Sequence, residues 1–133
     1  MIQLQTLNYL LDKKDTSMLL MNNISEEFFS DYTEEYRLIC HHLNEYGSIP
    51  DKLTFLDKFP NFDIVEVNES PDYLIDKLYD DRNTRKLADI FNNIRKLLVE
   101  GKIDEAMQLY TTSSDAVVKA KHIEAVDILR NYS

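Results

Sequence analysis

Apolar residues recur every three or four positions along most of this chain, a spacing that predicts amphipathic helices. The first predicted helix is marked by Leu4, Leu7, Leu10 and Leu11. The charged cluster at residues 12–15 ends it, and a short helix follows over residues 18–21 with Thr16 or Ser17 as its N-cap. All four positions of that short helix are apolar, which predicts that it is buried on most sides.

Residues 24–29 predict a helical turn rather than a strand. Ser25 suits its N-cap, and two acidic residues in the first turn precede an aromatic pair. A longer helix that includes residues 36–46 is predicted next, with its N-cap at Asp31 or Thr33. Two glutamates close to that cap favour the positive end of the helix dipole.

Turn residues delimit the next segments. Gly47 lies just past the end of the preceding helix, and Pro50 and Asp51 begin another helix over residues 52–59. Residues 62–67 have the composition of a strand, but apolar and polar positions do not alternate cleanly there. The expectation is a loop that can include a short extended piece.

The strongest periodicity lies in the second half of the chain. A Ser-Pro pair at residues 70–71 begins a helix, and an apolar stripe runs along residues 84–99. The stripe consists of Leu87, Ile90, Phe91, Ile94, Leu97 and Leu98. Gly101 ends this helix, and an apolar face resumes over residues 103–118, which predicts an αα-hairpin. A last helix is predicted over residues 122–131.

Composition supports an all-α fold. The chain has 133 residues, enough for one ordinary domain with its own core, and contains only 2 Gly and 3 Pro. So few turn-forming residues disfavour a sandwich or a barrel.

The charge balance argues against direct nucleic-acid binding. The formal net charge is −9, the wrong sign for a protein that depends on phosphate contacts. Five basic residues cluster in one predicted helix, and a solvated helix face explains them best. They are Arg82, Arg85, Lys86, Arg95 and Lys96.

Cysteine usage and hydropathy predict a soluble cytoplasmic protein. Cys40 is the only cysteine, so no disulfide framework exists, and its place on an apolar stripe predicts a buried side chain. No signal peptide is visible, and the apolar runs are far shorter than the roughly 18 residues that a membrane span needs.

No catalytic motif is present, and we predict no catalytic, cofactor-binding or metal-ligating residue. With glycine only at positions 47 and 101, the chain has no phosphate-binding loop. His41 and Glu45 are four residues apart and His42 is adjacent, but one His-Glu pair is a weak metal signal.

Residues 33–51, followed by the predicted helix over residues 52–59, resemble the N-terminal domain of DnaB-type replicative helicases. The shared features are a central helix, a glycine, a short link and a Pro-Asp helix start, preceded by a capped turn with an aromatic pair. The Asn44 to Pro50 segment is most like the helicases of tailed phages. The resemblance implies a helical head over residues 1–80, a protruding hairpin over residues 81–118 that forms a collar, and the start of a linker helix over residues 119–133.

The resemblance also implies a function, that of a non-catalytic collar domain in DNA replication. Such hairpins pair between subunits of a hexameric ring, which makes the apolar stripe listed above the expected subunit interface. The linker residues expected to dock on a neighbouring subunit are Ile123, Val126 and Leu129. The implied partners are a second copy (dimer or hexamer), a primase and a helicase loader. ATP and Mg²⁺ would belong to an ATPase domain missing from this fragment, and the parent helicase would act in a bacterial cell, encoded by the bacterium or by a phage.

Two other functions stay open at this stage. Residues 100–107 also resemble a tetratricopeptide-type turn and helix, which would suit a stand-alone adaptor or a helicase-interacting regulator, although only one such unit is visible. An enzyme with an unfamiliar helical site at His41, His42 and Glu45 is the third reading.

Overall fold

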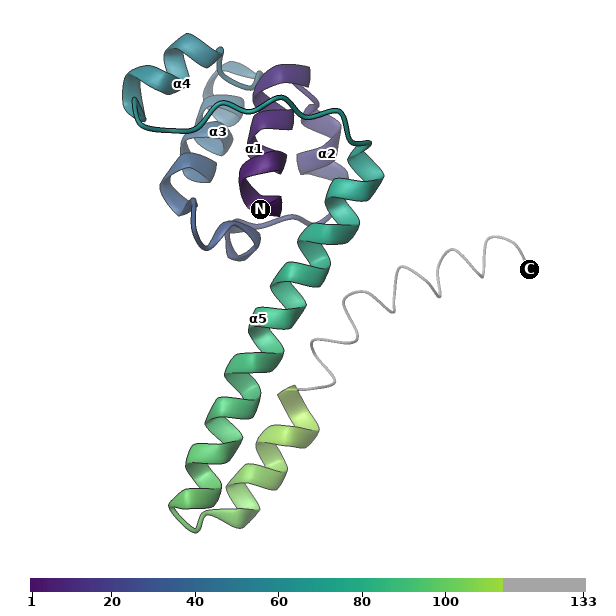
Figure 1. The fold of residues 1–133 in the computed structure, drawn as a ribbon, viewed down its shortest axis with the longest axis vertical. Helices are drawn as coiled ribbons and strands as arrows, with labels where there is room; N and C mark the ends of the chain where they lie inside the picture. The colour runs from purple at the N-terminus through teal and green to yellow at the C-terminus, as the bar shows by residue number, and fades with distance from the viewer. Residues whose placement is uncertain (114–133) are drawn as a thin grey trace, which may run out of the picture. The chain divides into compact units, whose positions relative to one another are not determined.

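A computed structural model describes residues 1–113, and this part of the chain is helical with no β-strand, as predicted (Figure 1). The elements are α1 (Ile2–Lys13), α2 (Thr16–Met21), the 3-10 helix η1 (Glu26–Phe29), α3 (Thr33–Tyr46), α4 (Lys52–Lys58) and α5 (Pro71–Val99). A further helix begins at residue 103 and continues to the end of the described range. The predicted helix over residues 122–131, the end of the return helix and the linker residues Ile123, Val126 and Leu129 lie outside the described residues. No helix in the described part is both long and apolar enough to cross a membrane.

The chain divides within α5 into two compact units, Met1–Leu78, called here the head, and Tyr79–Ser133, called the hairpin unit. The head has an aromatic core. Phe28, Phe29 and Phe55 are at most 2% exposed, and the ring of Phe29 stacks on that of Tyr36 with centroids 4.6 Å apart. Leucines from α1 complete the core because the apolar stripe of that helix faces inward.

The N-cap of α2 is Asp15, so the prediction of Thr16 or Ser17 was wrong. The Asp15 carboxylate accepts hydrogen bonds from the backbone N–H of Met18 at 3.2 Å and from the Ser17 hydroxyl at 2.6 Å. A carboxylate that follows a C-terminal turn can satisfy the free N–H groups of the next helix. The left-handed Lys14, with φ 56°, makes that turn and places Asp15 at the cap.

The α2 helix is only half buried, contrary to the sequence prediction. Met18 and Leu19 point into the head, whereas Leu20 is 71% and Met21 79% exposed. A six-residue helix on the surface of a core can bury only one side, whatever its composition.

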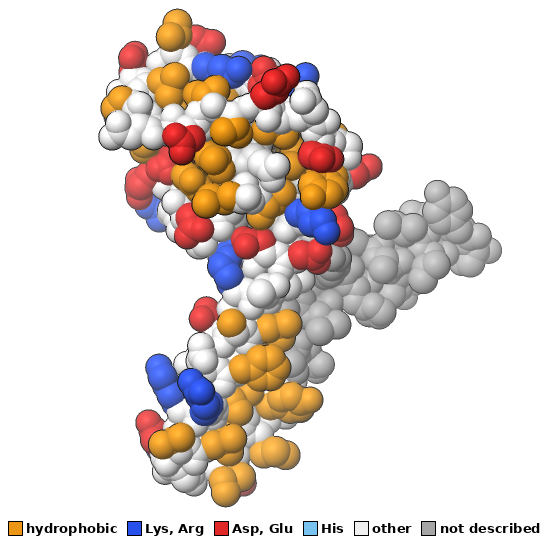
Figure 2. Space-filling model, viewed as in Figure 1, with side chains coloured by type: hydrophobic (Ala, Val, Ile, Leu, Met, Phe, Trp, Pro, Cys, Tyr) orange, Lys and Arg blue, Asp and Glu red, His pale blue; other side chains and the backbone are white. Residues whose placement is uncertain are grey.

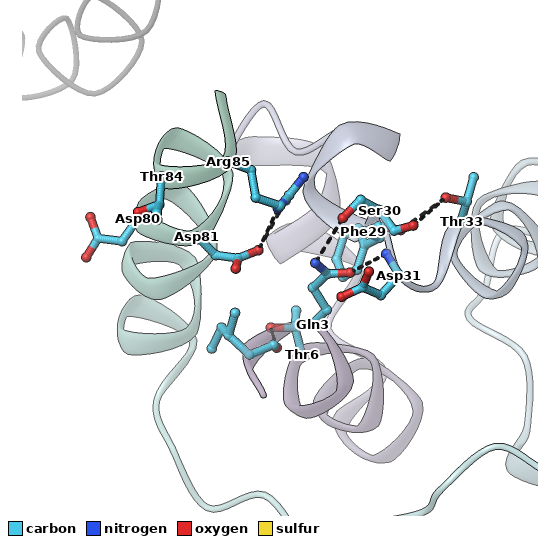
Figure 3. A network of polar contacts seen from close by, with 11 residues as sticks. Gln3, Thr6, Phe29, Ser30, Asp31, Thr33, Asp80, Asp81, Thr84 and Arg85 are labelled. Atoms are coloured by element: carbon cyan, nitrogen blue, oxygen red, sulfur yellow. Dashed lines mark hydrogen bonds and ion pairs between the residues drawn. The ribbon is translucent and has the colours of Figure 1, made fainter. Parts of the chain in front are cut away.

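A side chain of α1 fixes the backbone just before α3, and α3 has no side-chain N-cap of its own. Tyr32 is the N-cap residue and makes no side-chain capping bond, which corrects the assignment to Asp31 or Thr33. Instead, the buried Gln3 of α1 accepts a hydrogen bond from the backbone N–H of Asp31 at 2.9 Å and donates to the Ser30 hydroxyl at 3.3 Å (Figure 3).

The predicted loop between α4 and α5 is a loop, and α1 fixes its backbone. The buried side chain of Asn8 donates to the carbonyl of Asp63 at 3.0 Å and accepts from the N–H of Val65 at 2.9 Å. The Asn8 amide therefore pairs with the loop backbone as a neighbouring strand would. At the end of the loop, the Ser70 hydroxyl caps α5 by accepting from the N–H of Tyr73, as predicted.

Capping by Asp15 predicts a specific pH dependence. Hydrogen bonds from Ser17, Tyr9 and the Met18 N–H hold the pKa of Asp15 below its ordinary value. A depressed pKa means that the ionised group stabilises the fold above its unfolded pKa of about 3.9 and loses this effect as the pH falls through the folded value. We expect Asp15→Ala to cost about 1 kcal/mol at neutral pH, and the difference from the parent protein to shrink on acidification below pH ~4.

Urea unfolding of both proteins across this pH range measures the difference. Asp57→Ala is the matched control, because Asp57 is an exposed carboxylate within α4 and is not a cap residue. A cost for Asp15→Ala that stays constant with pH would contradict the capping role.

In the hairpin unit, Gly101 reverses the chain. Its φ is 77°, and the backbone N–H groups of Gly101 and Lys102 bond to the carbonyls of Leu98 and Leu97 at 3.1 and 2.8 Å. This pair of bonds is a Schellman motif, which ends α5 and allows the return helix to begin at residue 103. The predicted αα-hairpin is therefore present in the described residues (Figure 1).

The basic residues of α5 do not form one solvated face. Arg82 is buried, at 5% exposure, with its guanidinium 5.4 Å from the centre of the Tyr79 ring. Arg85 is half buried and pairs with Asp81 at 3.1 Å. Only Arg95 and Lys96 of the five are exposed, so the cluster does not offer phosphate groups a continuous basic strip.

Candidate interaction surfaces

The hairpin carries a large apolar surface. Its large hydrophobic residues that are more than half exposed are Phe91, Leu98, Val99, Ile103, Met107 and Tyr110. Orange side chains gather over this part of the molecule in Figure 2. We call these six residues the hairpin patch. Single exposed hydrophobic residues are common on soluble proteins, but a group of six on one short hairpin is typical of an interaction surface.

The structure divides the six residues predicted as an oligomer interface into two sets. Phe91 and Leu98 are 57% and 52% exposed and belong to the hairpin patch. The other four are only half exposed; these are Leu87, Ile90, Ile94 and Leu97. The second set is therefore partly covered, and fewer of the predicted positions are open to a partner.

Sequence reasoning missed four residues of the hairpin patch. Val99 lies at the end of α5, and the others lie on the return helix. A signal existed, because Ile103, Met107 and Tyr110 are spaced four and three residues apart and so share one helix face.

The head contains a groove of about 570 Å³ between α2 and α3. Its lining is mainly apolar, with Leu19 and Leu20 from α2 and Tyr36, Cys40 and Leu43 from α3. We call it the head groove. It combines buried floor residues with the exposed Leu20, which gives it a rim that a partner can cover.

The Tyr36 hydroxyl and the Cys40 thiol in the head groove are in their neutral, unreactive forms. Tyr36 is buried and donates its hydroxyl to the Ile24 carbonyl at 3.2 Å, and burial raises its pKa far above the ordinary value. Cys40 is half buried rather than buried, and desolvation raises the pKa of its thiol. A neutral thiol is a poor nucleophile, so these groups are suited to contact rather than to chemistry.

A second hollow, of about 410 Å³, lies between the start of α3 and the end of α4. Tyr32 and Phe62 form one wall, with ring centroids 5.8 Å apart, and Glu35 and Lys58 contribute opposite charges. Burial raises the pKa of both Tyr32 and Glu35. The mixed charges leave this hollow without a clear preference for one kind of ligand.

The histidines do not assemble a metal site in the described residues. His42 Nδ1 lies 2.6 Å from the Ser48 carbonyl oxygen, and its ring lies 4.9 Å from that of Tyr46. His41 and Glu45 are exposed on α3. Within residues 1–113 no three His, Cys, Asp or Glu side chains are grouped so that they could hold an ion.

Charge is distributed unequally between the two units. The head contains fifteen acidic and six basic residues, whereas the hairpin unit contains nine of each. The head therefore carries the whole formal charge of −9. Comparison with known proteins adds no assignment: no protein family, no curated protein and no solved structure matches this chain.

Proposed function

We propose that this chain is a non-catalytic assembly domain, the N-terminal collar of a DnaB-type hexameric replicative helicase. In this proposal the hairpin patch joins subunits, and the head recruits a primase or a helicase loader. ATP and Mg²⁺ would be bound by a separate ATPase domain of the parent helicase in a bacterial cell, with a bacterial or a phage gene as the source.

The observation that supports the proposal most directly is the hairpin patch. Exposing apolar side chains to water costs roughly 25 cal/mol of free energy per Å² of apolar surface. Covering them with a second copy of the chain removes that cost. A symmetric dimer places the same patch of two copies together, and two-fold dimers of this kind are the commonest symmetric oligomers. The acidic balance of the chain agrees with the absence of a DNA-binding role.

Sedimentation equilibrium of the purified chain tests the proposal. We expect the parent protein to self-associate at micromolar concentrations, and Phe91→Glu combined with Tyr110→Glu to weaken association at least ~100-fold, since two charges would enter an apolar interface. Both residues are more than half exposed, so the fold should tolerate the change.

The matched control is Leu53→Glu combined with Tyr46→Glu, two head residues that are each 74% exposed. This variant adds the same charge and should associate as the parent does. A parent protein that is monomeric at ~100 μM, far above the dissociation constant of a specific interface, would refute the assembly role and favour an adaptor whose hairpin patch binds a different protein.

A further inference from the structure

The head groove has the shape and composition of a site for a helix. It runs between α2 and α3, its floor is Leu19, Tyr36 and Cys40, and the exposed Leu20 stands at its edge. Apolar grooves between two helices commonly accept the apolar face of an amphipathic helix, with anchors spaced three and four residues apart. No segment among the described residues fills it, and its volume of about 570 Å³ suits a few such side chains.

The residues that line this groove are uncharged, and an acidic cluster built on η1 and α3 lies beside it. Glu26 is bonded to Arg37, which follows the groove residue Tyr36 on α3. Burial is the main cause of the raised pKa of Tyr36 and Cys40, and the Glu26 charge adds to it. Arg37 bonds to Glu26 at 2.9 Å and to Glu34 at 2.7 Å. One guanidinium therefore serves two carboxylates, and the cluster keeps a net charge of −1.

The head as a whole adds to this local excess, because it carries the entire formal charge of −9. Such a field attracts cationic partners and increases their rate of association. A second copy of this chain fits less well, because its head is equally acidic and residues 79–113 of its hairpin unit hold six acidic and six basic residues.

We propose that the head groove binds the apolar face of a basic amphipathic helix from a partner protein. The inference rests on the recruiting role proposed above and specifies its site and the chemistry of its partner. Leucine-type anchors would lie on Leu19, Leu20 and Leu43, and lysine or arginine side chains beside them would face Glu26 and the acidic head.

A pair of labelled model peptides tests this directly. Both are helices of about 18 residues, roughly 27 Å long, with leucines at i, i+4, i+7 and i+11. One carries lysines on the flanks of the leucine stripe, and the other carries glutamates at the same positions. We expect the lysine peptide to bind the full chain at least ~10-fold more tightly, with an affinity that falls as salt is added.

Variants locate the binding site. Leu20→Glu should weaken the lysine peptide at least ~10-fold, as expected for an interface anchor, even though it adds a negative charge that would attract the peptide. Leu53→Glu adds the same charge to an equally exposed leucine outside the groove and should leave binding within ~2-fold, as expected for a residue outside the contact. The Phe91→Glu/Tyr110→Glu variant should also bind normally, so failure of the assembly proposal and failure of this one are distinguishable.

Three outcomes would overturn the inference. Equal binding of the glutamate peptide would show that charge does not select the partner. Equal weakening by Leu20→Glu and Leu53→Glu would place the peptide elsewhere on the head. Loss of self-association in Leu20→Glu, with no competition from the lysine peptide, would assign the groove to a second copy of this chain.

Discussion

Replacing Phe29 with alanine should lower the free energy of unfolding by about 3–5 kcal/mol, the usual cost of deleting a buried aromatic ring. The side chain is completely buried, and its ring stacks on Tyr36 at 4.6 Å. The substitution removes both the burial of the ring and the stack, and it leaves a cavity beneath the N-terminus of α3. Since small domains have a total stability of only about 5–15 kcal/mol, this loss is a large fraction of the total.

Urea unfolding followed by circular dichroism measures this loss. Phe91→Ala is the matched control, because it deletes the same ring from a position that is 57% exposed. That substitution should change stability by less than about 0.5–1 kcal/mol when measured at a concentration where the chain is monomeric. Similar losses in the two variants would mean that Phe29 does not anchor the core.

The Asn8→Ala variant should lose about 1–3 kcal/mol, the cost of separating buried polar groups from their partners. Asn8 is 2% exposed and bonds to the backbone of Asp63 and Val65 at 3.0 and 2.9 Å. In the variant, the loop between α4 and α5 loses both of these hydrogen bonds to α1. Besides the global loss, we expect the Val65 amide to exchange with solvent much faster.

Hydrogen exchange read residue by residue separates the local effect from the global one. Asn22→Ala is a suitable control. Asn8 also donates its amide to the carbonyl of Leu4, four residues earlier, and Asn22 makes the same kind of bond to Met18, each at 3.0 Å. The Asn22→Ala variant should leave exchange at Val65 unchanged. Unchanged exchange at Val65 in Asn8→Ala would show that the loop is held by other contacts, such as the burial of Val67.

Local sequence signals predicted the helices of this chain and their C-terminal glycines well, but the N-caps of α2 and α3 wrongly. Gly47 and Gly101 were recognisable as C-terminal residues because a positive φ strongly favours glycine, and both adopt it. The α2 cap was missed because the left-handed turn falls on Lys14, a residue type that gives no such signal. Once that turn is known, Asp15 is the evident cap.

Long-range contacts were beyond the reach of sequence patterns. Gln3 and Asn8 lie within the first helix as polar residues of no special spacing, yet each fixes a backbone segment distant in the chain. The head groove was missed for the same reason, because Leu19 and Cys40 belong to different apolar stripes. The stripe on α5 was found, but periodicity alone cannot tell which of its residues face the return helix and which face water.

The turn at Gly101 also bears on the order in which the chain folds. It closes a hairpin whose two arms are joined by three residues, so their contacts form at little entropic cost. The head must instead close long loops, because the contact of Asn8 with Val65 spans 57 residues. Proteins rich in local contacts fold faster, so the hairpin unit can present its apolar patch before the head is complete. When the complete chain refolds from denaturant, it would therefore meet its assembly partner, or a chaperone, with the hairpin patch first.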